Sequence, residues 1–223
     1  MVSASFKMQT EPLKYNASTD TFEIGNQRLL RVTKILTEVL GDPYCGIPGE
    51  TLEKASKRGT AVHQIVQYMN HGKIINWGSV DKEDRDVLEP YAMAYQEFRR
   101  DYKNTVTGTE IRLHSPEWGF TGQIDIEAVN PKNELEIIDI KTLKTPDKRV
   151  IAQLGGYKHL WERNNRPRKV KRAFALYLWP HKSPGYKLVE VEDLAFAERW
   201  FLAMVTVAQG KRKVGMKLDL PVE

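Results

Sequence analysis

Charged side chains interrupt an otherwise apolar pair of strand-like segments between residues 119 and 142. The sequence GFTGQIDIEAVNPKNELEIIDIKT contains two candidate β-strands separated by the turn-forming residues NPKN. Asp125 lies in the first strand, and Asp139 and Lys141 lie in the second, within an isoleucine run typical of a strand buried on both faces. Buried charges are costly unless they are paired. This segment therefore constrains both the fold and the chemistry of the chain.

The register of this hairpin decides whether its two aspartates meet. A turn centred on Lys132 places Asp125 directly opposite Asp139, with their β-carbons about 5 Å apart, and puts Lys141 on the same face as Asp139. Because like charges destabilise such a pair, a bound cation is the natural resolution. A turn centred half a residue earlier would turn one strand over and separate the aspartates. The other alternative is a surface hairpin with solvated charges, which the apolar run around Asp139 argues against.

Composition and cysteine content limit the class of protein. The 223-residue chain is 41% hydrophobic and 28% charged, as expected for a globular protein with a sizeable core. No apolar run approaches the roughly 20 residues of a membrane span, and the first residues lack the apolar core of a secretory signal. The single cysteine, Cys45, excludes an internal disulfide, a cysteine-rich zinc site and a four-cysteine iron–sulfur cluster. We therefore expect a reducing, cytoplasmic location and no membrane association.

An excess of basic residues suggests a polyanionic partner. The net charge is +5 and the isoelectric point about 9.1. Residues 163–172 (RNNRPRKVKR) hold six basic side chains and no acidic one, and a second basic group lies between residues 211 and 217. Each run is also compatible with an ordinary solvated surface.

Hydrophobic periodicity and turn residues divide the chain into alternating elements. We expect a β-hairpin over 13–31, with turns at 16–20 and 25–26, and helices over 32–40, 48–70, 81–102, 145–163 and 194–210. Further strands are expected over 106–113, 171–179 and 186–191. These elements predict an α/β fold in one domain with a helical N-terminal half. Its parts are an N-terminal hairpin and helices (1–104), a β–β–β–α–β core extended by a strand (105–191) and a C-terminal helix (192–223).

Three helical positions are candidates for a functional site. His63 follows Gly59 by one turn, beside the apolar stripe of the helix over 48–70, where a histidine is also compatible with packing alone. Gln153 and Tyr157 share one face of the helix over 145–163. Tyr157 is equally compatible with a purely structural role in the core.

The helix over 145–163 has a clear start and an unusual middle. Thr145 is expected as its N-cap and Pro146 as its first helical residue. Gly155 and Gly156 in its centre together cost about 2 kcal/mol relative to alanine. Close approach of another backbone, or of a ligand, would explain the pair.

Two carboxylates and a lysine on one hairpin suit metal-assisted hydrolysis of a phosphodiester. Mg²⁺ takes oxygen ligands and commonly binds through one or two carboxylates together with phosphate oxygens. Such an ion polarises the phosphate and lowers the pKa of a bound water, and a neighbouring lysine orients or deprotonates the attacking water. The sequence contains no GxxxxGK[ST] phosphate loop, no HExxH helix and no GxSxG elbow. It therefore gives no support to a nucleotide-triphosphate enzyme, an HExxH metalloprotease or a GxSxG serine hydrolase.

Four motifs in order give the chain a family resemblance. GTAVH at residues 59–63, Asp125, DIK at 139–141 and QLGGY at 153–157 together resemble the PD-(D/E)XK nuclease superfamily. The upstream GxxxH and the downstream QxxxY are similar to motifs of its RecB-like branch. The opening residues 13–36 resemble the N-terminal segment of phage exonucleases and of the mitochondrial genome maintenance exonuclease. The resemblance covers residues 13–190 and implies a restriction-endonuclease-like core, a central mixed β-sheet flanked by helices.

The resemblance also implies roles for particular residues. It implies that Asp125 and Asp139 are metal ligands, helped by the backbone carbonyl of Ile140, and that Lys141 is the catalytic lysine. His63 would be a further metal ligand or active-site residue.

More distant positions follow from the same resemblance. Gln153 and Tyr157 would line the site, supporting its geometry or contacting the DNA strand, and Glu110 matches an acidic position that often precedes the first motif. Two departures stand out: Gln123-Ile124 replaces the proline of the motif before Asp125, and the middle acid is aspartate rather than the commoner glutamate.

The implied activity is that of a Mg²⁺-dependent deoxyribonuclease, with Mn²⁺ as substitute. We expect an exonuclease that acts on single- or double-stranded DNA ends in phage or bacterial recombination, repair or replication. The basic runs would then contact DNA phosphates, and a single-strand annealing or recombination protein is a candidate partner. The alternatives are a catalytically inactive DNA-binding module on the same fold and a restriction-like endonuclease.

Overall fold

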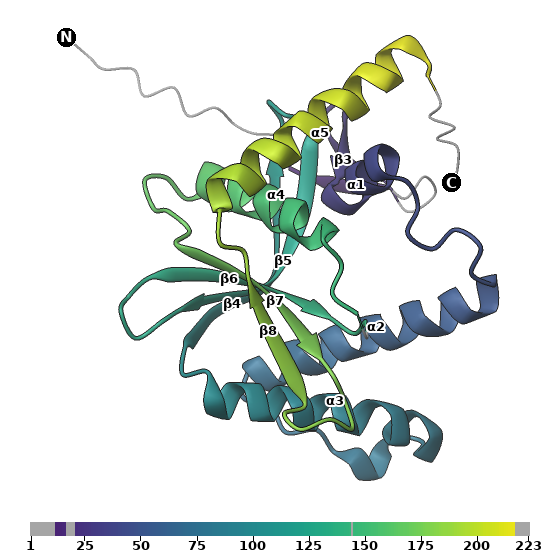
Figure 1. Ribbon diagram of the computed structural model, residues 1–223, viewed down its shortest axis with the longest axis vertical. Coiled ribbons are helices and arrows are strands. Elements are labelled where there is room, and N and C mark those ends of the chain that lie inside the picture. Colours follow the sequence, from purple (N-terminus) through teal and green to yellow (C-terminus); the bar gives the residue numbers. More distant parts are fainter. Residues whose placement is uncertain (1–11, 17–20, 144, 217–223) are drawn as a thin grey trace.

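A mixed β-sheet forms the centre of the molecule (Figure 1). The computed structural model describes residues 12–16, 21–143 and 145–216. The strands in these ranges are β1 (Lys14–Asn16), β2 (Thr21–Ile24), β3 (Gln27–Arg31), β4 (Thr105–Ser115), β5 (Phe120–Val129), β6 (Leu135–Lys141), β7 (Arg172–Leu178) and β8 (Tyr186–Glu190). Their order is β1-β2-β3-β5-β6-β7-β8, with β4 paired to β5, and the pairs β3–β5 and β6–β7 are parallel.

Helices cover both faces of this sheet. They are α1 (Val32–Leu40), α2 (Gly49–Asn70), α3 (Lys82–Asp101), α4 (Arg149–Asn164), α5 (Leu194–Val214) and the short 3₁₀ helix η1 (Trp77–Ser79). Figure 1 shows α1, α4 and α5 on one side and α2 and α3 on the other. The predicted α/β class and its flanked mixed sheet are confirmed, whereas the helical N-terminal half is only partly so, because that half also supplies β1, β2 and β3. In the described part of the chain we find no helix with the length and apolar character needed to cross a membrane.

The central hairpin has the predicted register. Its turn is closed by Asn130, whose side-chain oxygen accepts hydrogen bonds from Lys132 N (2.9 Å) and Glu134 N (3.0 Å). Strands β5 and β6 then pair from Val129↔Leu135 to Ile126↔Ile138, as a turn centred on Lys132 requires. The expected turn at 25–26 is also present, whereas the turn at 16–20 lies mostly outside the described residues.

Helix α4 begins later than the sequence predicts. Thr145 and Pro146 precede the helix, which starts at Arg149, so the expected N-cap at Thr145 is wrong. Asp147 organises this end instead. Its carboxylate accepts a hydrogen bond from Arg149 N (2.9 Å), and its own amide donates to the Tyr177 hydroxyl on β7 (3.2 Å). Because these contacts hold residue 147 against the sheet, the helix starts two residues beyond it.

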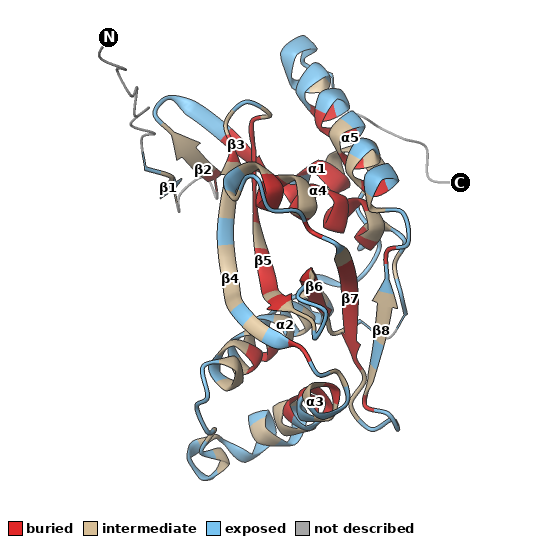
Figure 2. Ribbon diagram, turned by 90° about the vertical axis from the view of Figure 1, so that its left-hand side faces the viewer, coloured by how far each residue is buried: buried red, intermediate tan, exposed pale blue. Residues whose placement is uncertain are grey.

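The sheet separates two hydrophobic cores. One contains the inward residues of α1, α4 and α5, and the other those of α2 and α3; Figure 2 shows the buried strands between them. Along β7 the two cores receive alternate residues, as regular pleating requires. Along β5 they do not, because Ile124 belongs to the first core and Ile126 to the second. The strand therefore changes face at Asp125.

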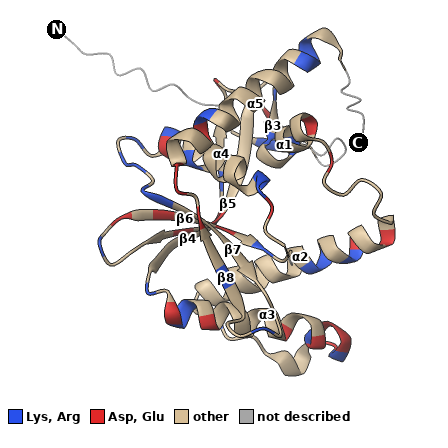
Figure 3. Ribbon diagram, viewed as in Figure 1, with Lys and Arg blue, Asp and Glu red and all other residues tan. Residues whose placement is uncertain are grey.

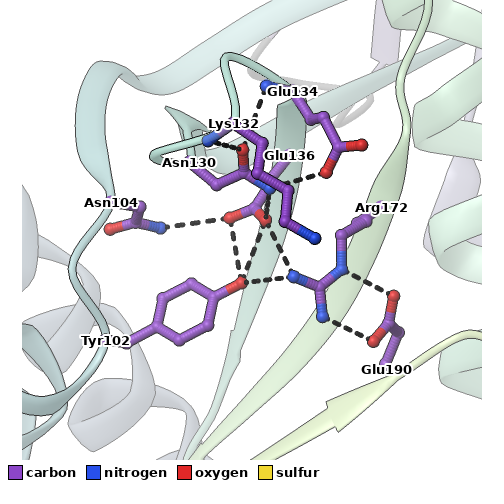
Figure 4. Close-up of polar contacts among 8 residues, drawn as sticks. All are labelled: Tyr102, Asn104, Asn130, Lys132, Glu134, Glu136, Arg172 and Glu190. Carbon is purple, nitrogen blue, oxygen red and sulfur yellow. Dashed lines mark hydrogen bonds and ion pairs between the residues drawn. The ribbon is translucent and has the colours of Figure 1, made fainter.

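A buried carboxylate holds the sheet together at the end of β6 far from Lys141 (Figure 4). Glu136 is fully buried. It accepts hydrogen bonds from the Tyr102 hydroxyl (3.0 Å) and from Asn130 Nδ2 (3.0 Å), and lies 3.3 Å from Arg172 Nη1. Arg172 also pairs with Glu190 through two hydrogen bonds of 2.7 and 2.8 Å. The network joins the end of α3, the hairpin turn, β7 and β8.

Helices α4 and α5 pack with almost no space between their backbones. A β-carbon on Gly155 would lie 2.2 Å from the Ala197 carbonyl oxygen of α5, and one on Gly156 would lie 2.9 Å from the Phe201 ring. The close approach of another backbone, one of the two expected explanations, therefore accounts for Gly155. The contact fixes α4, and with it Gln153 and Tyr157, against the sheet.

Candidate active site

The two strands of the hairpin separate at their aspartates. Their pairing stops at Ile126↔Ile138, and Asp125 and Asp139 are the next residues in that register. On the same edge of β5, at its other end, Leu30 of β3 pairs with Phe120. Asp125 thus lies between the part of β5 that pairs with β3 and the part that pairs with β6. Its Oδ2 accepts a hydrogen bond from Ile140 N (2.7 Å). A buried carboxylate here replaces the backbone partner that β5 would otherwise offer β6.

Asp139 meets the lysine of its own strand. It is 2% exposed, and its Oδ2 lies 2.7 Å from Lys141 Nζ. That contact is an ion pair without hydrogen-bond alignment, so Oδ2 is a buried oxygen that has no hydrogen-bond donor among the described residues. Lys141 Nζ donates to Gln153 Oε1 (2.9 Å), and Gln153 Nε2 donates to Asp139 Oδ1 (3.0 Å) and to the Tyr157 hydroxyl (2.9 Å). Gln153 therefore fixes the positions of both charged groups.

Glu110 faces the same point from β4 with an unusual backbone. Residues on either side of it pair with Ile124 and Ile126, which places Glu110 opposite Asp125. Its φ of 52° is in the left-handed region, which costs a non-glycine residue roughly 1–3 kcal/mol. Its carboxylate accepts a hydrogen bond from Gln123, which in turn accepts one from Arg112. The distortion coincides with the change of face in β5 and aims the carboxylate at His63.

His63 reaches the two carboxylates from α2. Its Nδ1 lies 3.4 Å from Asp125 Oδ1 and 3.5 Å from Glu110 Oε1. Gly59, one turn earlier, lies near Thr142 at the end of β6, with 3.8 Å from a built β-carbon to the hydroxyl. Burial lowers the pKa of His63, but the Asp125 and Glu110 carboxylates outweigh that effect and raise it to about 10. A protonated imidazole therefore supplies positive charge between the two acids.

Burial and charge also shift the neighbouring groups. Burial raises the pKa of Asp139 to about 6, although the ammonium of Lys141 acts in the opposite direction. For Lys141, burial lowers the pKa, but the adjacent Asp139 carboxylate more than offsets it, so the pKa lies above its usual value. Burial raises the pKa of the Tyr157 hydroxyl well above its usual value. Tyr157 is thus a neutral hydrogen-bonding group at any physiological pH.

These residues fit a divalent cation. His63, Glu110 and Asp125 each offer one ligand atom, and all three atoms lie within 4.8 Å of one another. Two ligands about 2.1 Å from one Mg²⁺ ion lie at most about 4.2 Å apart, and the separations of 3.4 and 3.5 Å from His63 satisfy that limit. Asp139 Oδ2, which faces the Lys141 ammonium, is a further buried carboxylate oxygen beside these ligands. Metal binding requires a neutral imidazole, so an ion would displace the proton of His63.

Every residue expected at the site lies in or beside this cluster. We expected a cation between Asp125 and Asp139. Two side chains already supply positive charge there, because His63 lies beside Asp125 and Lys141 beside Asp139. Ile140 is bound through its amide rather than through the carbonyl oxygen implied by the resemblance, whose role as a ligand stays a prediction.

Sequence reasoning missed two polar residues beside Glu110. Arg112 and Gln123 hold its carboxylate, yet neither stood out as a candidate. A signal was present for Gln123, because it precedes Asp125 by two residues in the same strand, where the sequence departs from the motif by lacking its proline.

The basic run at 163–172 lies away from the cluster. It connects α4 to the start of β7, whereas Lys141 lies at the other end of β6, and Figure 3 shows its Lys and Arg on that loop. Three of its six cations form ion pairs: Arg163 with Glu117, Lys169 with Glu162, and Arg172 with Glu136 and Glu190. The structure therefore gives half of the cations in this run a structural role.

Comparison with known proteins identifies the family. A sequence model described as the PD-(D/E)XK nuclease superfamily matches residues 29–214. The chain belongs to this nuclease superfamily. The PD-(D/E)XK match includes the GTAVH, Asp125, DIK and QLGGY motifs, and the predicted resemblance is confirmed at the level of the superfamily.

Solved structures found by comparison include proteins described as exonucleases. A protein from Eubacterium rectale described as a candidate exonuclease has 15% sequence identity and a TM-score of 0.50, with 87% of this chain and 91% of that chain covered. LHK-Exo, an alkaline exonuclease from Laribacter hongkongensis, has 15% identity and a TM-score of 0.42 in its complex with dAMP, with 84% and 93% covered. A search of curated proteins found no match.

Proposed function

We propose that this protein is a metal-dependent deoxyribonuclease that degrades DNA from its ends. The observation that carries the proposal is the convergence of His63, Glu110 and Asp125 on one point beside the Asp139–Lys141–Gln153 chain. Such a set offers the ligands for a hard cation with a lysine next to them, an arrangement suited to metal-assisted hydrolysis of a phosphodiester. Mg²⁺ is the expected ion, with Mn²⁺ as substitute.

Each side chain has a distinct role in this proposal. His63, Glu110, Asp125 and Asp139 would hold the ion, which supplies Lewis-acid polarisation of the phosphate and a water of lowered pKa. Lys141, directed by Gln153, would orient the attacking water and offset negative charge on the phosphate. Tyr157 keeps Gln153 in place through its neutral hydroxyl.

Several features support exonuclease action in a bacterial or phage-infected cell. The motif order resembles the RecB-like branch, and a protein of similar fold is described as a candidate exonuclease. We extend the proposal to a single catalytic domain in the cytoplasm, to single- or double-stranded DNA ends in recombination, repair or replication, and to a single-strand annealing or recombination protein as partner.

A DNA-binding module without catalysis is the main alternative. It would not require buried acids beside a buried lysine, because removing water from such charges costs several kcal/mol per ion. A restriction-like endonuclease is the second alternative, and linear and circular DNA separate it from an exonuclease because only linear DNA offers an end.

The test is a time course on end-labelled single- and double-stranded oligonucleotides with Mg²⁺, with Mn²⁺ and with EDTA. We expect cleavage that needs the ion, shortens the strand from one end and spares circular single-stranded DNA. Asp125→Ala, Lys141→Ala and the isosteric Asp139→Asn should each abolish cleavage while DNA affinity, measured by fluorescence anisotropy, changes little. Asp84→Asn, an exposed acid on α3, is the matched control.

Two outcomes would contradict the proposal. Full cleavage by a folded Lys141→Ala protein would remove the mechanism. DNA binding without cleavage under every divalent metal would favour the binding module instead. Circular dichroism spectra of each variant show whether a loss reflects chemistry or unfolding.

A further inference from the structure

A cavity of about 530 Å³ opens beside the metal-binding cluster. Helices α1 and α2, the segment that joins them, the end of β6 and the start of α4 form its walls. His63 and Lys141 belong to its lining, so the cavity and the candidate catalytic groups share a boundary. Its volume falls within the range of about 300–1,000 Å³ of pockets that hold small organic ligands. A mononucleotide belongs to that size class.

One cation in this cavity has no partner among the residues that the structure describes. Lys141 is bound to Asp139 and Gln153, and Arg149 is bound to the carbonyl oxygens of Leu40 and Gly41. Arg58 also lines the cavity, and among the described residues we find no hydrogen bond or ion pair for it. Its Nε is nevertheless buried, so the N–H group has been removed from water without compensation.

Such an arginine is suited to an anion. A guanidinium offers several donors in a planar fork that matches a phosphate, and an incoming phosphate would satisfy the unpaired N–H. Asp147, the carboxylate in the lining, does not compete for Arg58, because it accepts a hydrogen bond from Arg149 N and lies 3.9 Å from the Arg149 guanidinium. The charges left facing the space are therefore positive.

The rest of the lining suits a planar ring. Leu36, Leu52 and Val150 give it an apolar wall, and Tyr44 in the segment between α1 and α2 is 44% exposed. The Tyr44 ring stacks on no other aromatic ring of the described residues. Nucleobases stack on such rings independently of sequence, at about 1–3 kcal/mol per base.

We propose that this cavity binds the terminal nucleotide of a DNA strand, with Arg58 on its phosphate and Tyr44 on its base. The inference rests on the proposed nuclease function and deepens it, because it places a strand end directly beside Lys141 and the metal ligands. A one-nucleotide pocket at that point favours release of single nucleotides from an end over cleavage within a strand.

The experiment titrates mononucleotides into the whole protein in EDTA and follows binding by calorimetry. The probes are deoxyadenosine 5′-monophosphate, deoxyadenosine 3′-monophosphate and deoxyadenosine. EDTA removes binding through an ion, so only the cavity is measured. We expect one monophosphate to bind at least tenfold more tightly than deoxyadenosine, and the preferred isomer identifies the strand end that the pocket accepts.

Substitutions assign the binding to the two residues. Arg58→Ala should lower monophosphate affinity at least tenfold and leave deoxyadenosine unchanged, whereas Arg58→Lys should restore part of it. Tyr44→Ala should weaken all three probes, and Tyr44→Phe should not. The controls are Lys57→Ala, an exposed neighbour paired with Glu53, and Tyr68→Ala, an exposed tyrosine outside the cavity lining.

The outcomes separate this inference from the nuclease proposal. Equal affinity of wild-type protein, Arg58→Ala and Tyr44→Ala for the monophosphates, or no binding at all, would overturn the pocket even if the protein cleaves DNA. Loss of binding in Arg58→Ala with retained binding in Lys57→Ala supports it. The oligonucleotide time course with Mg²⁺ decides the nuclease proposal independently, and thermal melts show whether each variant is folded.

Discussion

Gln153 is the residue on which the geometry of the candidate site depends most. Its amide oxygen accepts from Lys141 and its amide nitrogen donates to Asp139 and Tyr157. No other uncharged side chain in the described cluster contacts both the lysine and the acid. A neutral amide can do so because it combines a donor and an acceptor in one plane.

We predict that Gln153→Ala lowers the turnover rate about 10- to 100-fold, the effect typical of residues that orient catalytic or metal-binding groups. The KM for DNA should change little, because Gln153 positions Lys141 and Asp139 and is not proposed to contribute to DNA affinity. Steady-state kinetics on a labelled oligonucleotide measure both quantities. Gln64→Ala, an exposed neighbour of His63, is the control, and an unchanged turnover rate in Gln153→Ala would contradict the role.

At the scale of residues, the sequence predicted what turn chemistry and strand period determine. The turn at Asn130 sets the register, and the register brings Asp125 to Asp139. The sequence could not predict the left-handed backbone of Glu110 or a buried Arg58 Nε that lacks a hydrogen-bond partner among the described residues. Both depend on which groups distant parts of the chain place nearby, and no local pattern carries that information.

At the scale of elements, contacts between α4 and α5 hold the site helix in place. Gly155 permits the backbones to touch, and a polar cluster lies beside it. Glu198 of α5 accepts from His159 Nδ1 (2.9 Å) and Lys158 Nζ (2.5 Å) of α4. The glycine pair was recognisable in the sequence, but the identity of its neighbour required the fold.

Gly155→Ala should lower the free energy of unfolding by about 1–3 kcal/mol or more, because the new methyl group collides with the Ala197 carbonyl and forces the helices apart. Gly210→Ala is the matched control in α5, where the space is open and alanine should stabilise the helix by up to about 1 kcal/mol. Urea unfolding curves measure both. Equal stability of the two variants would show that the close helix contact does not exist.

The α4–α5 contact also predicts a pH dependence. Hydrogen bonds from His159 and Lys158 lower the pKa of Glu198 from 4.5 to about 2 despite partial burial. A depressed carboxylate pKa stabilises the fold above pH 4.5, and that contribution disappears as pH falls toward 2. Glu198→Gln should thus cost about 1–2 kcal/mol at pH 7, after allowance for solvent screening.

The difference in the free energy of unfolding between wild-type protein and Glu198→Gln should shrink steadily as the pH falls from 4.5 to 2. Urea unfolding at pH 3, 4, 5 and 7 measures it. Glu53→Gln, which removes an exposed pair with Lys57, should stay within about 0.5 kcal/mol of wild type throughout. If Glu198→Gln lowered the free energy of unfolding by the same amount at every pH, its effect would come from lost packing rather than from lost charge.

At the scale of the whole molecule, the candidate site joins parts that are far apart in the sequence. His63 comes from α2, Glu110 from β4 and Asp125 from β5, so the ligands of one ion would connect a helix of the N-terminal part to two strands of the sheet. Alternation of strands and helices predicted the class of fold. Strands β3 and β6 pair with successive parts of the same edge of β5. That arrangement follows from long-range packing, so the sequence pattern could not predict it.

Because an ion binds the folded state alone, it should stabilise the whole molecule. At a Mn²⁺ concentration of about 100 times the Kd the gain is about 2.7 kcal/mol, or a rise in Tm of roughly 5–10 °C for a chain of this size. Differential scanning calorimetry with Mn²⁺ and with EDTA measures it. Asp125→Asn should remove the shift and Asp84→Asn should keep it; an equal shift in both would place the ion elsewhere.

The hydrogen bond from Ile140 N to Asp125 Oδ2 gives the site a reporter in its own backbone. Most strand amides are protected by a neighbouring carbonyl, but this one is protected by a carboxylate that would also face the ion. Its chemical shift and hydrogen-exchange rate should therefore change when an ion binds to Asp125. A single amide resonance could then follow occupancy of the site in solution, without substrate and without any label in the cavity.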